Sequence, residues 1–303
     1  MKAKLVNTWQ QKASPNQSIA VSRCCKLIDL QLSRYYAITT RQALPPKVDH
    51  TQLALKVAFM ASGQTYGSRR LVRTLNNQGI TVGRYRVRTL MRAAQLDPVW
   101  KRKFVRTTDS KHTGRIASNL LQQDFKVKKM NTVWVADITY IRTQSGWLYL
   151  AAVMDLYARK IVGWSLASHM WASLVCSALN MAIIARQPSA GLVVHTDQGS
   201  QYASDDYLKL LAKYQITASM SGRGNCYDNA VMERFFLNLK MEQVWQTHYA
   251  NHQEATRDIS HYIVAFYNGS RLHSSLGYLS PNQFEAKLTE IQKKQSNEVS
   301  NFT

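Results

Sequence analysis

Three acidic residues, Asp137, Asp197 and Glu233, have surroundings in the sequence that favour metal chemistry. Asp137 lies inside the apolar run VWVADITYI, and Asp197 ends the apolar run LVVHTD. A carboxylate in such a run is unfavourable unless it is paired or binds a metal ion. Carboxylate oxygens suit Mg²⁺, which keeps water ligands and takes substrate phosphates as further ligands. The three acids therefore predict a site for metal-dependent phosphoryl transfer.

Each acid also has a structural interpretation. Asp155 ends another apolar run and competes with Asp137 for the first position. Asp197 precedes Gln-Gly-Ser, which is typical of a turn, and Glu233 is compatible with an ordinary helix surface. The residue types alone leave these alternatives open.

A long helix is expected from about Asp228, its predicted N-cap, to beyond Lys240, and it carries further polar residues near Glu233. Asn229, Glu233 and Lys240 are spaced at i, i+4 and i+11, so they share one helix face. A lysine two turns beyond a metal-binding Glu is well placed to hold a DNA phosphate, and we expect Asn229 to contact DNA as well. The alternative is an amphipathic helix with an incidental lysine.

Histidines provide a weaker metal hypothesis. His195, close to Asp197, is either a metal ligand or a residue that shapes the strand end, and we favour the second role. His248 and His252 are four residues apart on an expected helix, which is a zinc-like spacing. No CxxC pair accompanies them, so we expect no zinc site.

The elements that must position these residues follow an α/β order. Three segments rich in β-branched and aromatic residues predict consecutive antiparallel strands over 133–141, 147–155 and 160–168. The pattern then predicts helices and strands in alternation, at about 171–186 (helix), 192–197 (strand), 204–214 (helix) and 216–221 (strand), before the long helix. This order indicates a layered α/β core over residues 131–290.

Positive charge is concentrated before this core. The chain of 303 residues has a formal charge of +21. Residues 1–130 carry 25 Lys and Arg against 5 Asp, whereas residues 131–303 carry 14 against 13 acids. Such asymmetry predicts that the N-terminal part binds a polyanion such as DNA. Because no signal-peptide core and no membrane-spanning apolar stretch are present, we expect a cytoplasmic protein without a membrane partner.

Helical units account for most of the basic part. Residues 17–38, within a unit over 1–45, predict two short helices, as a helix-turn-helix or a plain helical hairpin. Residues 46–100 predict a helix-turn-helix-like DNA-binding domain. Residues 101–130 are expected to be a basic linker, and residues 291–303 a flexible tail.

The last helix of the second unit, from about Arg84 to Gln95, has two distinct faces. Val87, Leu90, Met91 and Ala94 recur at core spacing. Arg84, Arg88 and Arg92 form a separate line, here called the arginine stripe. Like charges at this spacing repel one another unless phosphates neutralise them, so the stripe favours DNA contact over an idle solvated face.

Four spans carry a family resemblance: VWVADITYI, HTDQGSQYAS, SGRGNCYDNAVMERFFLNLKMEQV and YNGSRLHSSLGYLSPNQFE. They resemble the integrase-type transposases of bacterial insertion sequences, most closely the second-frame product (OrfB) of the IS-three family. The family pattern has two Asp and a Glu, with 35 residues between the second Asp and the Glu. The same 35 residues separate Asp197 from Glu233, and Lys240 stands where the family has a Lys or Arg.

This resemblance implies a ribonuclease-H-like integrase core with a mixed five-stranded sheet, preceded by helical DNA-binding domains. It implies that Asp137, rather than Asp155, joins Asp197 and Glu233 in binding Mg²⁺, with Mn²⁺ able to substitute. The implied reaction is cleavage of DNA to free a 3′-hydroxyl, followed by transfer of that end to another phosphodiester. The implied partners are the terminal inverted repeats of the element, the target DNA, further copies of the chain assembled on DNA, and the upstream-frame product of the element.

The resemblance also covers the segment YNGSRLHSSLGY, the closing motif of the family. It implies DNA contact for Asn268, Arg271 and His273, and packing of this last loop on the core is the alternative. The chain departs from the family at three places. It has Thr196 where family members often have Ser, and Gln198 where they often have Arg. The segment Leu27-Ile28-Asp29 lacks the Gly that they often have there. The alternative function is a non-catalytic DNA-binding regulatory product of a mobile element. The presence of all three acids favours the transposase.

Overall fold

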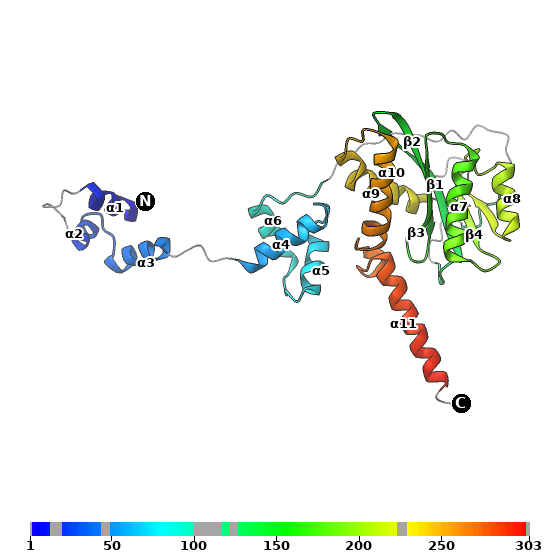
Figure 1. Ribbon diagram of the computed structural model, residues 1–303. Coiled ribbons are helices and arrows are strands. Elements are labelled where there is room, and N and C mark those ends of the chain that lie inside the picture. Colours follow the sequence, from blue (N-terminus) through cyan, green and yellow to red (C-terminus); the bar gives the residue numbers. More distant parts are fainter. Residues whose placement is uncertain are drawn as a thin grey trace. The chain divides into compact units, whose positions relative to one another are not determined.

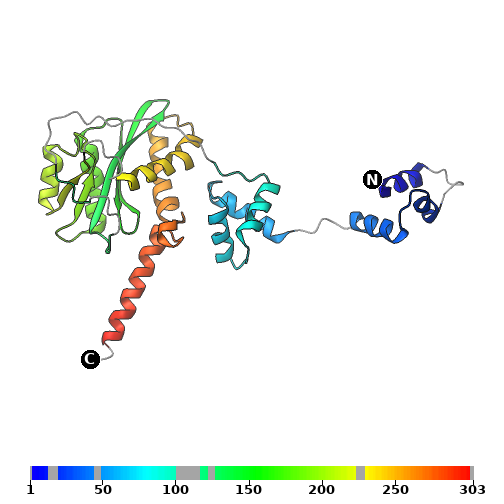
Figure 2. The same cartoon turned by 180° about the vertical axis from the view of Figure 1, so that it is seen from behind.

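The computed structural model describes residues 2–12, 20–43, 49–99, 117–121, 127–222 and 229–300. The chain divides into two compact units, Met1–Ala54 and Leu55–Thr303. Figures 1 and 2 show the elements from opposite sides. Most of the predicted basic linker, including Lys101, Arg102 and Lys103, lies outside the described residues.

The first unit contains the helices α1 (Lys2–Lys12), α2 (Val21–Leu27) and α3 (Leu32–Ala43). The two helices predicted over 17–38 correspond to α2 and α3, whereas sequence reasoning did not identify α1. Its small core consists of Ala3, Val6, Cys24, Cys25 and Tyr35. Asp29 joins α2 to α3 with φ of 50°. Asp tolerates this left-handed conformation, so the turn forms although the family's Gly is absent.

Three helices, α4 (His50–Ala61), α5 (Ser68–Asn77) and α6 (Arg84–Ala93), lie in the segment predicted to be helix-turn-helix-like. In α6, Val87, Leu90 and Met91 are buried. All three residues of the arginine stripe are exposed. The two predicted faces of this helix are therefore present in the structure.

A five-stranded sheet forms the centre of the second unit. Its strands are β1 (Val133–Thr143), β2 (Gly146–Asp155), β3 (Lys160–Ala167), β4 (Val193–Thr196) and β5 (Thr217–Met220). The order is β3-β2-β1-β4-β5, and β1 to β3 form the predicted antiparallel meander. Strand β4 runs parallel to both β1 and β5. The mixed five-stranded sheet implied by the resemblance is thus confirmed.

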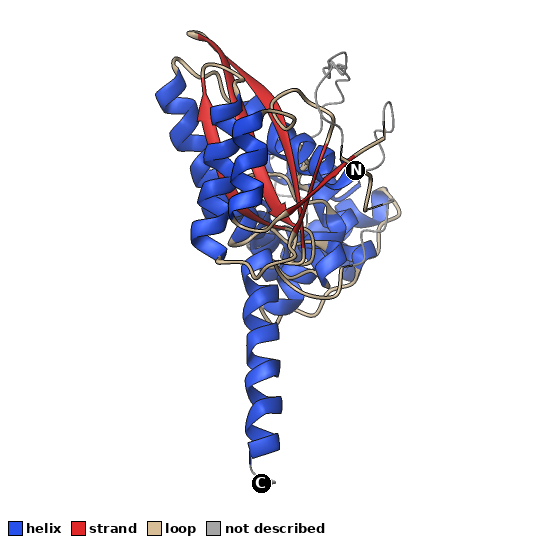
Figure 3. Ribbon diagram, turned by 90° about the vertical axis from the view of Figure 1, so that its right-hand side faces the viewer, coloured by secondary structure: helices blue, strands red, loops and turns tan. Residues whose placement is uncertain are grey.

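Helices cover both faces of the sheet (Figure 3). On one face, α7 (Ala172–Arg186) and α8 (Asp205–Lys213) pack against a cluster that includes Trp134 and Ala136 of β1. On the other face lie α9 (Ala230–Glu242), α10 (His252–His261) and the π-helix η3 (Tyr262–Asn268), packed on Val135 and Ile141. Residues of β1 alternate between the two cores because successive strand side chains point to opposite faces.

Glycine is required where α7 crosses β3. A Cβ atom at Gly163 would collide with the backbone carbonyl oxygen of Ala178 and with Ala182. The absence of a side chain lets the helix approach the strand closely, which brings Ala178 and Ala182 into the core.

A short 3₁₀-helix, η2 (Val244–Gln246), lies between α9 and α10. After η3 come a second 3₁₀-helix, η4 (Ser274–Leu276), and the last helix, α11 (Pro281–Ser300). A capping box begins α11, since Ser280 and Gln283 exchange side-chain-to-backbone hydrogen bonds of 3.0 and 3.3 Å. Residues 291–300, which belong to the predicted flexible tail, continue α11. No Gly or Pro interrupts 282–300, so nothing local ends the helix.

Part of the predicted linker belongs to the core. The N–H of Leu120 donates to the Ser219 hydroxyl at 2.9 Å, and the N–H of Met220 donates to the carbonyl of Ser118 at 3.4 Å. Leu121 is buried in the cluster under α9. Residues 117–121 therefore run beside β5, and the buried side chain of Leu121 packs them against the core of the second unit.

Candidate active site

The sheet brings Asp137, in β1, close to Asp197, which directly follows β4. Strands β1 and β4 are parallel, with Val135 opposite His195. Asp137 lies two residues beyond Val135 on the same face of β1, the face covered by α9. Asp197 lies two residues beyond His195, and its charge acts on Asp137, so the two carboxylates are neighbours.

Asp137 lies in a strongly perturbing environment. Burial raises the pKa of its carboxyl well above the ordinary value, and the charge of Asp197 raises it further. A hydrogen bond from the N–H of Ile138, at 2.7 Å, and the charge of Lys240 lower this pKa, while Glu233 raises it. The charges of Asp197, Glu233 and Lys240 therefore all act on the Asp137 carboxyl.

Glu233 lies in the first turn of α9 and is exposed. Partial removal from water raises the pKa of its carboxyl. The start of α9 is held on β1 by Asn229, whose side-chain amide donates to the carbonyl oxygen of Ala136 at 3.5 Å. Asn229 is buried, with 5% exposure, so the structure gives it a positioning role and does not support the predicted DNA contact. Asp228, the predicted N-cap, lies outside the described residues.

Lys240 extends from the same helix toward β1. Its Nζ atom lies 4.3 Å from the centre of the Tyr140 ring, a cation–π contact. Burial lowers the pKa of Lys240, and the charge of Asp137 raises it. The ammonium group therefore lies near the carboxylates, and the aromatic ring helps to orient it.

The donor set fits a hard divalent cation in its chemistry. Asp137 and Asp197 offer adjacent oxygen ligands, and Glu233 offers a third from the helix. Within the described ranges, no three His, Cys, Asp or Glu side chains lie close enough together to hold a metal ion in their present positions. Binding by all three acids would therefore require their side chains to approach one another.

Tyr202 is a residue near this site that sequence reasoning missed. It is 2% exposed, and its hydroxyl has no hydrogen-bond partner in the described part of the chain. Burial raises its pKa well above the ordinary value, and Asp137 and Asp197 contribute to the rise. Its place in HTDQGSQYAS was the available signal, but only the packing shows that the ring lies near both acids.

Comparisons with known protein families match the helical segment before the sheet and the segment that contains the sheet separately. Models of an integrase core domain match residues 127–226 and 214–281, and a model of an HTH-like domain matches residues 49–104. The "Insertion element IS600 uncharacterized 31 kDa protein" of Shigella sonnei is 42% identical over 269 residues, covering 88% of this chain and 99% of that protein. "Transposase InsF for insertion sequence IS3A" of Escherichia coli (strain K12) is 38% identical over 275 residues, covering 88% and 94%. The chain belongs to the IS-three family of transposases.

Solved integrase structures are also similar to the transposase. The HTLV-2 integrase catalytic core domain in complex with magnesium has 17% identity and a TM-score of 0.40, covering 51% of this chain and 96% of that chain. The catalytic core domain of BIV integrase has 18% identity and a TM-score of 0.40, covering 53% and 99%.

The family and the sheet topology together establish the fold of the catalytic core and the broad type of activity. The mixed sheet and the integrase core match give the transposase a ribonuclease-H-like core, as the resemblance implied. The HTH-like and integrase core domains support DNA binding and a polynucleotidyl transferase activity. No helix among the described residues is long and apolar enough to cross a membrane.

Asp155 and His195 of the transposase have structural roles. Asp155 is fully buried and accepts hydrogen bonds from the N–H groups of Asn131 and Tyr157 at 2.7 and 2.9 Å, with Arg186 at 3.6 Å. The ring nitrogens of His195 contact the hydroxyl groups of Ser219 and Ser221 at 2.9 and 3.1 Å. These contacts occupy both side chains and agree with the preference for Asp137 over Asp155.

Arg271 is buried, with 2% exposure, and forms an ion pair with Glu242. Its Nη2 and Nε atoms donate to the two carboxylate oxygens at 2.6 and 2.8 Å. Burial alone would lower the pKa of Arg271, but the hydrogen bonds and charge of Glu242 raise it above the ordinary value. The guanidinium group of Arg271 is therefore committed to an ion pair in the core, and its DNA contact stays a prediction that this burial disfavours.

The rest of the closing motif is also packed inside the protein. The side-chain amide of Asn268 exchanges hydrogen bonds with the backbone of Ile161 at 2.9 and 3.0 Å. His273 is 8% exposed, and burial and then the charge of Arg271 lower its pKa to about 3. The hydroxyl of Tyr66 accepts from the N–H of Leu272 at 2.8 Å. The structure shows the alternative, packing of this loop on the core, at both residues, and DNA contact of Asn268 and His273 stays a prediction.

The structure also places the two histidines with zinc-like spacing and the two residues near Asp197 that depart from the family pattern. His248 precedes α10, which begins at His252, so the two histidines do not share a helix face as predicted. Gln198 donates from its side-chain amide to the carbonyl of Ser221 at 2.9 Å, and Thr196 is buried. Both departures from the family pattern thus support the end of β4 and β5.

Proposed function

We propose that this transposase cleaves DNA at the ends of an insertion sequence and transfers the freed 3′-hydroxyl to another phosphodiester. Asp137, Asp197 and Glu233 would hold divalent ions, with Mg²⁺ as the natural cofactor and Mn²⁺ able to substitute. The observation that carries the proposal is that Asp137 in β1 and Asp197 directly after the neighbouring parallel strand β4 lie close together. Adjacent half-buried carboxylates repel one another unless a cation or a proton neutralises them.

The acidic and basic residues of this chain would have different roles in the reaction. Bound metal ions would activate the attacking oxygen and stabilise the leaving one. Lys240, oriented over Tyr140, would hold a phosphate near the scissile bond. The exposed arginine stripe of α6 would hold DNA further away.

The division of labour remains part of the proposal. Residues 46–100 would recognise DNA, residues 101–130 would connect, and residues 131–290 would perform the chemistry in the cytoplasm of a bacterium. The unit over 1–45 would assist recognition if its helices act as a helix-turn-helix. The working complex would contain several copies of the chain on the terminal repeats, together with the upstream-frame product.

Isosteric substitutions at the three acids test the proposal. Asp137→Asn, Asp197→Asn and Glu233→Gln each remove an anionic ligand at nearly constant shape, so each should abolish cleavage and joining of cognate ends in Mg²⁺ while DNA binding persists. Asp206→Asn, which removes an exposed acid on α8, is the matched control and should keep full activity. Full joining by any one of the three variants removes that residue from the site.

The alternative function has its own outcome in the same assay. A regulatory product without catalysis would bind the element ends but join none, even in the presence of the upstream-frame product and either metal. Such a result for the unaltered chain would replace the transposition reaction with DNA binding alone.

A further inference from the structure

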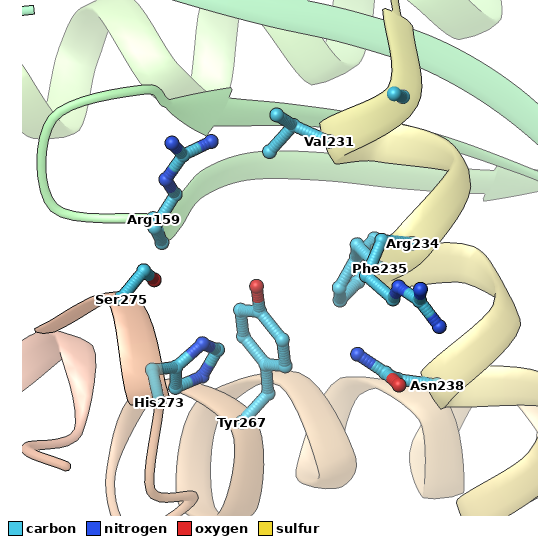
Figure 4. Close-up of a pocket in the computed structure, with 9 residues that line it drawn as sticks. Arg159, Val231, Arg234, Phe235, Asn238, Tyr267, His273 and Ser275 are labelled. Atoms are coloured by element: carbon cyan, nitrogen blue, oxygen red, sulfur yellow. The ribbon is translucent and has the colours of Figure 1, made fainter. Parts of the chain in front are cut away.

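A half-open cavity lies along α9, on a helix face that does not carry Glu233 and Lys240. Its volume is about 240 Å³, and it is lined by α9, the turn between β2 and β3, and the end of η3 with the loop that follows (Figure 4). Sites for whole drug-sized ligands measure about 300–1,000 Å³, so this space suits a single chemical group. Its polar and charged lining residues are Arg159, Arg234, Asn238, Tyr267, His273 and Ser275.

The charge of this cavity is positive. The described residues that line it include Arg159 and Arg234 and no carboxylate. Neither arginine takes part in the ion pairs of the described chain, in contrast to Arg271 and Arg186. Arg159 is half-buried, and this burial lowers the pKa of its guanidinium group. An anion in the cavity would compensate this positive charge.

Tyr267 points its hydroxyl group into the same space (Figure 4). The residue is 3% exposed, and its ring is held by edge contacts with Phe235 and His273, at centroid distances of 4.7 and 4.9 Å. The Nε2 atom of His273, which also lines this space, is buried and has no hydrogen-bond partner among the described residues. Buried polar atoms are normally paired, so this atom indicates a ligand.

We propose that this cavity binds a phosphate group of the DNA strand that the transposase processes, with Arg159, Arg234 and the Tyr267 hydroxyl as donors. Guanidinium groups match phosphate oxygens in geometry and charge, and a hydroxyl supplies one further donor. Arg234 directly follows Glu233 in α9, so the cavity adjoins the helix that carries a proposed metal ligand. This placement favours a phosphate of the bound strand over free phosphate. The inference rests on the proposed function only for the identity of the ligand as DNA.

Chemical modification of arginine tests the proposal on the full-length chain. Phenylglyoxal reacts with accessible guanidinium groups, and mass spectrometry reports the extent of reaction at each residue. A duplex carrying an element end, added without metal, should slow the modification of Arg159 and Arg234 several-fold. Arg257, exposed on α10, serves as the internal reference and should react at an unchanged rate.

Two variants link this protection to the cavity. Tyr267→Phe removes only the hydroxyl, so it should reduce protection of Arg159 while the melting temperature stays within a few degrees. The double variant Arg159→Asn/Arg234→Gln should lower the slope of log Kd against log salt by about 0.9, the value for one phosphate contact. Asn is chosen at residue 159 because its φ is 55°, which Asn tolerates. Lys209→Gln, an exposed charge on α8, is the control and should leave the slope unchanged.

Each other outcome overturns the inference. If neither DNA nor inorganic phosphate protects Arg159 and Arg234, the cavity binds no phosphate. If inorganic phosphate protects them and the duplex does not, the ligand is free phosphate rather than DNA. Since the measurement requires no metal and no turnover, its result is independent of whether the acids catalyse cleavage.

Discussion

The buried ion pair between Arg271 and Glu242 leads to the sharpest prediction, because sequence reasoning placed Arg271 on DNA. In Arg271→Gln the guanidinium group is lost, and Glu242 keeps the hydrogen bond from the Tyr262 hydroxyl at 2.6 Å. Both charged side chains are nearly inaccessible, with 3% and 6% exposure. Removing one partner of such a pair leaves a buried uncompensated charge, which costs about 3–5 kcal/mol.

This loss should be visible in thermal unfolding. A change of 1 kcal/mol shifts the melting temperature by about 2–4 °C for a domain of roughly 150–250 residues, so Arg271→Gln should melt about 6–20 °C lower. Circular dichroism of the full chain measures the shift. Arg257→Gln, which removes an exposed arginine from α10, is the matched control and should melt like the unaltered protein. The double variant Arg271→Met/Glu242→Leu should recover much of the loss, since neither buried charge remains.

An unchanged melting temperature of Arg271→Gln together with weaker DNA binding would refute this reasoning. That result would mean that the ion pair contributes little and that the guanidinium group reaches DNA, as the sequence alone suggested. A lower melting temperature with normal DNA affinity at low temperature supports the structural role.

Three further predictions address the remaining charged groups. Lys240→Ala should slow cleavage while changing stability little, because a cation–π contact contributes about 0.5–1 kcal/mol; equal kinetics and melting would leave Lys240 without a role in the reaction. Substituting Gln at all three positions of the arginine stripe should flatten the slope of log Kd against log salt by up to about 2.7, and an unaltered slope would make the stripe a solvated surface. The pKa of His273, about 3 in the folded chain, is below its ordinary value, so the unfolded chain takes up the proton first and stability falls as pH drops from 6.5 toward 3. His273→Gln should therefore lose less melting temperature between pH 7 and pH 4 than the unaltered chain; an equal loss would show that other groups dominate.

Secondary structure in this chain was largely predictable because its signals are local. The β-branched runs before Asp155 and the buried stripe of α6 have the periodicities of a strand and of a helix, and both elements formed as predicted. The helix α1 was missed because its apolar residues show weak periodicity, and contacts with α2 and α3 complete its core. Tertiary packing there overrides a weak local preference.

The sequence by itself determined the three candidate acids, their spacing and the charge asymmetry, since each is a property of residue types along the chain. Only the tertiary structure decided which polar residues face one another. Asp137 adjoins Asp197 because β1 pairs in parallel with β4, about sixty residues later in the chain. Arg271 is buried because Glu242, 29 residues away, provides its counter-charge. A motif shows which side chains are present, but the free energy of exposing or burying a charge depends on partners that only folding brings within hydrogen-bond distance.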